Sequence, residues 1–255
     1  TLSNFAYSQT EISGGIYSNT LWSPTGSPYI VSGKVTVFEG VELSIAPGTL
    51  VKFNADASLE IRGKLTAKGT VTDSIEFTSN LNSPGWNSWI GIIANGTNLP
   101  QGVGDQITME YCIGKHALYF VDLDYGVHGP YIFKHCYFGN NFQVNRDGGY
   151  PVAVFDHCTF EDNRLGLDWG GDDFRVSHCN FINNVNGLNG VAIVDTCYFS
   201  GNTGIALSPY GATSGCTIEN NNIGVSCYFG STNNTFVNNV ITNNQIGVEI
   251  LSYFN

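Results

Sequence analysis

Positive charge is scarce in this chain of 255 residues, which has 10 Lys and Arg against 21 Asp and Glu and a formal net charge of −11. No Lys or Arg follows Arg175, whereas Asp195, Glu219 and Glu249 lie beyond it. Nucleic-acid binding requires the opposite electrostatic field, so we expect no DNA or RNA partner. An acidic polysaccharide would also be repelled unless a cation bridged it to the protein.

Long apolar runs and helical patterns are also missing. No stretch approaches the ~20 apolar residues that a transmembrane helix needs, so we expect no transmembrane segment. No segment combines a basic start with an apolar centre, so an export signal would have been removed or would lie outside this sequence. Apolar residues alternate over short runs that Gly and Asn separate, which indicates short β-strands instead of helices.

What the chain does contain is one phrase that recurs between Glu110 and Asn255. It reads His-Cys-Tyr-Phe-Gly-Asn-Asn at 135–141, His-Cys-Thr-Phe-Glu-Asp-Asn at 157–163 and His-Cys-Asn-Phe-Ile-Asn-Asn at 178–184. Weaker copies begin at Thr196, Gly215 and Asn238, and successive copies are 22, 21, 18, 19 and 23 residues apart. A repeat of this length is one supersecondary unit that buries its apolar face by stacking on its neighbours. The sequence therefore predicts a β-solenoid.

Stacking at the ~4.8 Å spacing of β-strands places equivalent residues above one another and gives each column a role. Inward Cys and Phe are expected to form small and large apolar ladders. The recurring Asn is expected to mark a corner, because Asn tolerates the left-handed conformation and can bond to local backbone or from coil to coil. This column comprises Asn141, Asn163, Asn184, Asn202, Asn221 and Asn244.

The phrase resembles the repeat of right-handed parallel β-helices in the pectin-lyase-like superfamily, where a Gly-Ile-x-Leu strand follows the Asn. Matching stretches are 204–207, 224–227 and 247–250, and the front of the chain fits from Tyr29 onward. The resemblance implies an all-β, single-stranded right-handed parallel β-helix of about ten coils over residues 29–255, after a lead-in, first coil or cap at 1–28. The last residues lie in or just after a strand without a polar cap, so we expect a truncated piece of a longer protein with further domains.

Seven cysteines suggest disulfides in a secreted chain, but their spacing argues for free thiols. Six of them share one column, and in-register stacking keeps neighbouring Cβ atoms farther apart than the ~3.8 Å of a disulfide. Cys227 leaves this column, so a Cys216–Cys227 bridge across one coil is the remaining option. His135, His157 and His178 precede the cysteines at a corner, where we expect a structural ladder of neutral imidazoles, with a metal site as the alternative.

In the superfamily that the repeat resembles, the working surface is the outward face of one parallel sheet, which the Gly-Ile-x-Leu strands mark here. Threading the repeats onto it places carboxylates on three successive coils, beside aromatic and amide side chains. Candidate Ca²⁺ ligands, suited to an ion that accepts irregular oxygen coordination, are Asp122, Asp124, Asp147, Asp168, Asp172 and Asp173. Candidate contacts to sugar rings and hydroxyls are Tyr119, Trp169, Asn145, Asn189 and Tyr228. Candidate catalytic residues are Asp147, Asp168, Arg146 and His128.

Several functions compete for these residues. A bound Ca²⁺ would neutralise a uronate carboxylate and favour proton removal by Arg146 or His128, as in a lyase or epimerase. Two carboxylates ~5–9.5 Å apart would serve glycoside hydrolysis instead. No lyase or epimerase signature surrounds Arg146, so we expect a secreted or cell-surface domain that binds a polysaccharide or other glycan and acts in adhesion. A polysaccharide-processing enzyme is the alternative, and a structural spacer of a larger surface protein is the second alternative.

Overall fold

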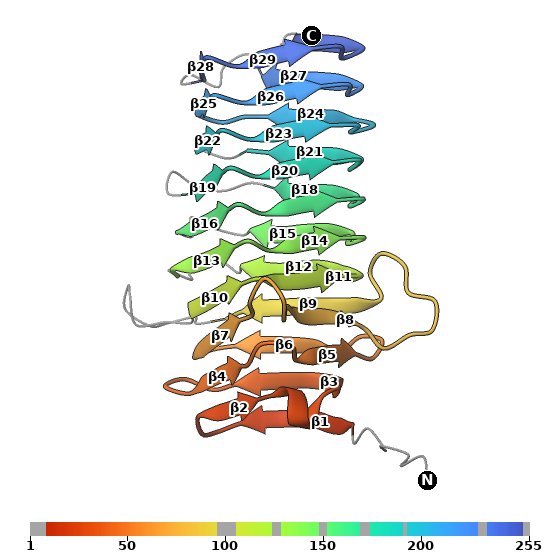
Figure 1. Ribbon diagram of the computed structural model, residues 1–255, viewed down its shortest axis with the longest axis vertical. Helices are drawn as coiled ribbons and strands as arrows, with labels where there is room; N and C mark the ends of the chain where they lie inside the picture. Colours follow the sequence, from red (N-terminus) through yellow and green to blue (C-terminus); the bar gives the residue numbers. More distant parts are fainter. Residues whose placement is uncertain are drawn as a thin grey trace.

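The chain winds into a parallel β-helix of about nine turns, close to the number of coils predicted. A computed structural model describes residues 9–95, 106–123, 129–147, 152–168, 174–190, 193–228 and 234–251, without the side chains of Asp147 and Tyr228. Figure 1 shows the strands stacked along the long axis, from the N-terminal coils to the C-terminal coils. The predicted all-β solenoid is thereby confirmed.

Three parallel rows of strands run along the axis, and a typical coil contributes one strand to each row. The β2 row is a ten-stranded sheet that consists of β2 (Thr20–Trp22), β4 (Glu42–Ile45), β7 (Lys64–Lys68), β10 (Gln106–Glu110), β13 (Tyr131–Lys134), β16 (Ala153–Asp156), β19 (Phe174–Ser177), β22 (Ile193–Asp195), β25 (Ala212–Ser214) and β28 (Thr235–Val237). A single 3-10 turn, η1 (Pro24–Gly26), is the helical element of the described chain.

The other two rows form one 20-stranded sheet, because β1 (Thr10–Ile16) and β3 (Tyr29–Val37) each run through both. The β5 row consists of β5 (Leu50–Phe53), β8 (Ile75–Ser79), β11 (Cys112–Lys115), β14 (Tyr137–Gly139), β17 (Thr159–Glu161), β20 (Asn180–Ile182), β23 (Tyr198–Ser200), β26 (Thr217–Glu219) and β29 (Val240–Thr242). The β6 row consists of β6 (Ser58–Ile61), β9 (Trp89–Ala94), β12 (Ala117–Leu123), β15 (Gln143–Asp147), β18 (Leu165–Asp168), β21 (Asn186–Asn189), β24 (Ile205–Ser208), β27 (Ile223–Tyr228) and β30 (Ile246–Leu251).

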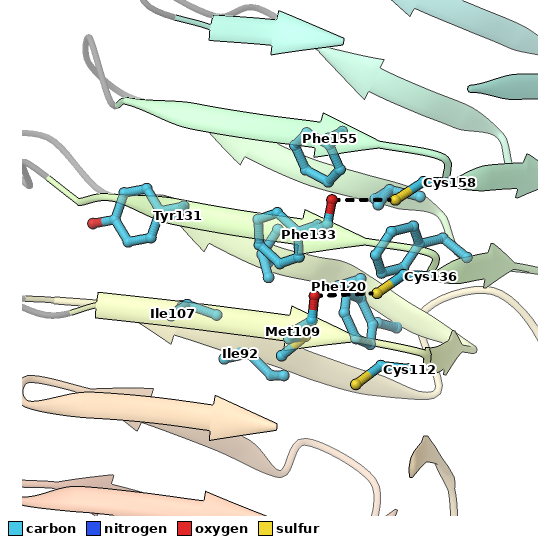
Figure 2. Close-up of a cluster of buried hydrophobic side chains, with 14 of the residues drawn as sticks. Ile92, Ile107, Met109, Cys112, Phe120, Tyr131, Phe133, Cys136, Phe155 and Cys158 are labelled. Atoms are coloured by element: carbon cyan, nitrogen blue, oxygen red, sulfur yellow. Dashed lines mark hydrogen bonds between the residues drawn. The ribbon is translucent and has the colours of Figure 1, made fainter. Parts of the chain in front are cut away.

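The core between the rows is built from aromatic columns, as the Phe repeat predicts. Strand register pairs Phe160 with Phe181 and Phe181 with Phe199, and all three side chains are fully buried. The rings of Phe160 and Phe181 stack with centroids 4.6 Å apart, and a second stacked pair, Phe133 and Phe155, comes from the β2 row. Figure 2 shows this second column beside the cysteine sulfurs. Because each ring packs on its equivalent in the next coil, the ladders join successive coils into one continuous core.

The cysteines form the predicted ladder of free thiols, and no bridge joins Cys216 to Cys227. The Cys158 N–H donates to the sulfur of Cys179 over 3.3 Å, so the sulfurs bond from coil to coil. The Cys158 thiol in turn donates to the Phe133 carbonyl at 3.5 Å (Figure 2). Burial raises the pKa of the Cys158 and Cys179 thiols, so they stay protonated and unreactive.

The asparagine column is present, but its predicted backbone conformation was wrong by one position. The left-handed φ angle belongs to the residue before each ladder Asn, for example Asp162 at 55° and Asn183 at 55°. Asn163 and Asn184 themselves are fully buried. The Asn184 Oδ1 accepts hydrogen bonds from both the backbone N–H and the Nδ2 of Asn163, each at 3.0 Å. The column is therefore an inward ladder of amides that ties each coil to the next.

The outermost C-terminal coil that the structure describes exposes apolar side chains, including Val240, Val248 and Ile250. The division of the chain into 1–28 and 29–255, and the presence of further domains, stay predictions. The described residues include no helix with the length and hydropathy that a membrane span requires.

Candidate functional site

A shallow groove lies on the outward face of the β6 row, where β18, β21 and β24 run side by side. Its volume is about 200 Å³, and its lining consists of Leu165, Asp168, Asn186, Leu188, Asn189, Ile205 and Ser208. Register aligns Asp168 with Asn189 and Asn189 with Ser208, which gives a polar column across three coils. These strands belong to the sheet that the superfamily resemblance predicts to be the working surface.

Two predicted site residues, Asp168 and Asn189, meet in this groove. The Asn189 Nδ2 donates to Asp168 Oδ1 at 2.8 Å, and the Gln143 Nε2 donates to Asp168 Oδ2 at 3.2 Å. Both Asp168 and Asn189 remain partly exposed, so their remaining hydrogen-bonding capacity faces solvent. A carboxylate held between two amides presents fixed acceptor oxygens, which suits recognition of hydroxyl groups.

Asn145 was predicted as a sugar contact, and its position contradicts that prediction. Its side chain is fully buried. The Asn145 Nδ2 donates to the Asp168 carbonyl at 2.7 Å, and the Asp168 N–H donates back to Asn145 Oδ1 at 2.8 Å. The backbones of β15 and β18 pair in register at one position only, Gln143 with Leu165. Beyond it, the Asn145 side chain supplies the hydrogen bonds that a paired backbone would otherwise make. Asn145 therefore holds the backbone of Asp168 from the adjacent coil, and its own side chain does not face solvent.

Arg146, Asp122 and Tyr119 form a closed cluster on the neighbouring coils. Arg146 donates from Nε and Nη2 to the two oxygens of Asp122, at 2.9 and 2.6 Å, and Asp122 is 6% exposed. The guanidinium carbon lies 4.7 Å from the centroid of the Tyr119 ring and covers one of its faces. The side-chain hydrogen bond to Asp122 raises the pKa of Arg146, which is the opposite of what a catalytic base requires.

This cluster changes the assignment of all three residues. Proton removal by Arg146 stays a prediction, and the bidentate ion pair that keeps its guanidinium protonated counts against it. The Asp122 carboxylate is committed to Arg146, so it is a poor Ca²⁺ ligand. Tyr119 carries a cation on its face where a sugar ring would stack. The cluster therefore lies on the coils that precede the groove in the stack.

Other predicted site residues lie outside what the structure describes. These are His128, Trp169, Asp124, Asp172 and Asp173. Asp147 and Tyr228 lie at the ends of β15 and β27, and the description of these two residues stops at their backbone. Their proposed roles in Ca²⁺ binding, sugar binding and catalysis stay predictions.

A buried carboxylate on the same outward face was missed at the sequence level. Glu60 of β6 is 1% exposed and accepts hydrogen bonds from Thr36 Oγ1 at 2.8 Å and Asn95 Nδ2 at 2.6 Å. Lys34 Nζ and Arg62 Nη2 lie 2.9 and 3.2 Å from its oxygens. Burial by itself would raise the pKa of Glu60, but these four partners outweigh it and lower the pKa to about 2. The alternation of charged residues in Lys34-x-Thr36 and Glu60-x-Arg62 was the available signal.

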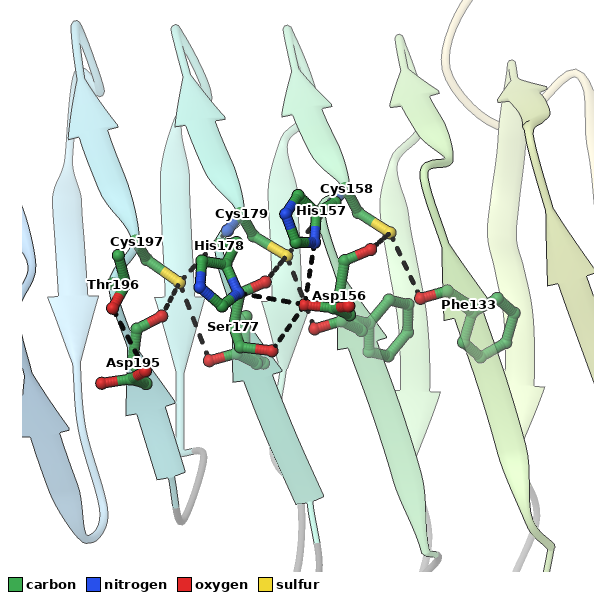
Figure 3. A network of polar contacts seen from close by, with 12 residues as sticks. Phe133, Asp156, His157, Cys158, Ser177, His178, Cys179, Asp195, Thr196 and Cys197 are labelled. Atoms are coloured by element: carbon green, nitrogen blue, oxygen red, sulfur yellow. Dashed lines mark hydrogen bonds and ion pairs between the residues drawn. The ribbon is translucent and has the colours of Figure 1, made fainter. Parts of the chain in front are cut away.

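The histidine column lies at the corner between the β2 and β5 rows. Each member has a left-handed φ: 53° at His135, 54° at His157 and 54° at His178. The rings of His157 and His178 stack with centroids 4.6 Å apart, which confirms a ladder. Figure 3 shows both rings directed at Asp156, whose Oδ1 lies 3.1 Å from each Nδ1. Asp156 therefore belongs to this column, a contact that the sequence pattern alone did not indicate.

Asp156 is held as an anion at this corner. Burial would raise its pKa, but the hydrogen bonds from Ser177, His178 and His157 prevail and lower it below the ordinary value. The Ser177 hydroxyl donates to the same Oδ1 at 2.8 Å. Three donors thus converge on one carboxylate oxygen.

The fold and the groove define a parallel β-helix protein with a shallow depression of about 200 Å³ on one sheet. No protein-family model matches the chain, and no solved structure matches it. Among curated proteins, the protein bark beetle of Drosophila melanogaster is 36% identical over 77 residues. Those residues are 30% of this chain and 2% of the fly protein, so the match spans a small piece of a far longer chain. Membership of the pectin-lyase-like superfamily stays a prediction.

Proposed function

We propose that this protein is a secreted or cell-surface β-helix module that binds a neutral polysaccharide in the groove over β18, β21 and β24. The observation that carries the proposal is the polar column of Asp168, Asn189 and Ser208 beside the apolar side chains of Leu165 and Ile205. Sugar rings combine hydroxyls with apolar C–H faces, so alternating polar and apolar columns match their two kinds of surface. A flat sheet of fixed strands also preorganises these contacts.

The size and charge of the groove narrow the ligand class. A volume of about 200 Å³ lies below the ~300–1,000 Å³ of pockets that enclose a small molecule, so we expect a short stretch of a longer chain to lie across it. The net charge of −11 and the Asp168 carboxylate disfavour a uronate chain. A Ca²⁺-bridged acidic polysaccharide is the weaker alternative within the same site.

We prefer binding to catalysis because of the number of carboxylates that line the groove. Among the described residues that line it, Asp168 is the single carboxylate, and both its oxygens accept amide hydrogen bonds. Hydrolysis by general acid and base uses two carboxylates. The six ladder cysteines are buried, and this burial would shield them from oxidation if the protein is extracellular.

The test is affinity electrophoresis and calorimetry against neutral and uronate polysaccharides, with and without Ca²⁺. We expect retardation by a neutral polymer, and at least about a tenfold loss of affinity in Asn189→Ala. Asn180→Ala is the matched control, because Asn180 is also partly exposed and lies on β20, outside the groove. Equal losses in both variants, or no retardation by any polymer, would overturn the proposal. Reducing ends or unsaturated products in the same incubations would reveal an enzyme instead.

A further inference from the structure

Asp156, His157 and His178 bring three metal-ligating groups together at one corner of the β-helix (Figure 3). Asp156 ends β16, His157 follows it, and His178 occupies the same corner one coil further on. The ligand atoms of the three residues all lie within 4.8 Å of one another. The two imidazoles are about half exposed, so an ion can reach them from solvent.

We propose that this corner binds one divalent transition-metal ion, with Zn²⁺ as the expected occupant, through Asp156 Oδ1 and the Nδ1 atoms of His157 and His178. Zinc takes His nitrogen and Asp oxygen at ~2.0–2.2 Å, so neighbouring tetrahedral ligands lie ~3.4 Å apart. The 3.1 Å between Oδ1 and each Nδ1 is already close to that value. Because the ion lies in the plane of each imidazole that binds it, the two half-exposed rings rotate out of their stack to complete the set, and water takes the fourth position. Nitrogen ligands disfavour Ca²⁺ and Mg²⁺.

The backbone holds the two imidazoles in a shared orientation. The His157 N–H donates to the Ser177 carbonyl at 3.1 Å, and the His178 N–H donates to the Asp195 carbonyl at 3.0 Å. The stacked rings differ in plane by 16°, and both Nδ1 atoms lie 3.1 Å from the same carboxylate oxygen. The Ser177 hydroxyl fixes that carboxylate by donating to its Oδ1, as outer-shell partners of metal ligands do. The ion replaces the two imidazole hydrogen bonds to Asp156, with the ring protons on Nε2.

Comparison with the neighbouring coils shows which contacts at the Asp156 corner recur along the β-helix and which occur at this corner. Ser214 donates to Asp195 Oδ1 at 2.5 Å, which repeats the pair of Ser177 and Asp156, but the corner residue beside Asp195 is Thr196. The Asp–Ser pair therefore belongs to the repeat, and the two imidazoles are the addition. Along the strand column Lys134 lies in register with Asp156 on one side, and Asp195 follows Ser177 on the other. Their opposite charges offset each other at the site.

The test is titration of the untagged, chelator-treated chain with Co²⁺, read by the visible absorption of tetrahedral Co²⁺, followed by Zn²⁺ competition and calorimetry. We expect one ion per chain, displaced by Zn²⁺, and a loss of affinity of at least about tenfold in His157→Asn, His178→Asn or Asp156→Asn. Asn suits this left-handed corner, because Asn238 occupies it in the last coil with φ 55°.

His135→Asn is the matched control, since His135 shares the column and the left-handed backbone but lies outside the ligand set. Its affinity should equal that of the wild-type chain. No Co²⁺ band, a stoichiometry far above one, or unchanged binding in His178→Asn would overturn the proposal. Equal weakening by His135→Asn would also overturn it, because the ion would then sit elsewhere on the acidic surface.

Discussion

Replacing Glu60 by Gln should destabilise the N-terminal coils in a manner that depends on pH. Glu60 is buried on the outward side of β6. Its carboxylate forms ion pairs with Lys34 and Arg62 and accepts hydrogen bonds from Thr36 and Asn95. These partners lower its pKa from 4.5 to about 2, in spite of burial that acts in the other direction. A carboxyl whose pKa is lowered by folding stabilises the protein above its unfolded pKa, and that stabilisation is lost as the pH falls through the folded pKa.

The size of this stabilisation follows from the shift in the pKa of Glu60. Lowering the pKa from 4.5 to about 2 corresponds to about 3 kcal/mol at neutral pH. Lys34 and Arg62 are 56% and 38% exposed, so solvent screening makes this figure an upper limit. Between pH 7 and pH 3 the unfolded carboxyl takes up its proton while the folded one stays largely ionised. The linkage removes about 2 kcal/mol of the stabilisation over that interval.

The assay is urea unfolding of the wild-type chain and Glu60→Gln at pH 7 and pH 3, followed by far-UV circular dichroism. We expect the difference in free energy of unfolding to be largest at pH 7 and to shrink by about 2 kcal/mol at pH 3. Glu42→Gln is the control, because Thr66 and Lys64 also lower the pKa of Glu42, but its side chain is 33% exposed. An equal destabilisation by Glu60→Gln at both pH values would refute the electrostatic reasoning and point to lost packing.

Two further predictions concern the ladders. Asn184→Ala should lower the free energy of unfolding by about 3 kcal/mol, because it leaves the buried N–H of Asn163 without its side-chain acceptor and removes the hydrogen bond to the Phe160 carbonyl. Asn244→Ala, at the half-buried end of the ladder, should cost less in the same urea titration. N-ethylmaleimide should modify the half-exposed Cys227 in the native protein and reach the six buried cysteines after unfolding, as mass spectrometry will show; early modification of Cys179 would contradict the buried ladder.

The repeated phrase was sufficient to predict the solenoid and its inward columns. Cys, Phe and Asn recur at fixed offsets, and in-register stacking converts each offset into one column. The phrase could not predict which residue turns the corner. Both Asn183 and Asn184 tolerate a left-handed φ, and the burial of the second side chain, which depends on the neighbouring coil, decides between them.

The candidate site was predictable as a surface but not as a set of contacts. Threading placed Asp122 on the outward side and Arg146 in the loops that follow the strands, and it gave no sign that the two are in register and pair with each other. Threading assigned Asn145 to the outward face or the adjoining turns. The β15–β18 ladder breaks beside it, and the buried amide takes over the missing backbone bonds. The repeat length varies between 18 and 23 residues, and such irregularity makes register changes invisible in one sequence.

The scarcity of Lys and Arg in the second half of the chain has a structural consequence. In the early coils, carboxylates pair with cations from neighbouring coils, as Glu60 does with Lys34 and Asp122 does with Arg146. In the late coils, carboxylates accept from hydroxyl groups instead, as Asp195 does from Ser214, Glu219 from Tyr198 and Glu249 from Ser226. A hydroxyl donor satisfies a carboxylate without neutralising its charge. The later coils therefore keep a net negative field, which attracts cations, and the imidazole corner at Asp156 lies where this half begins.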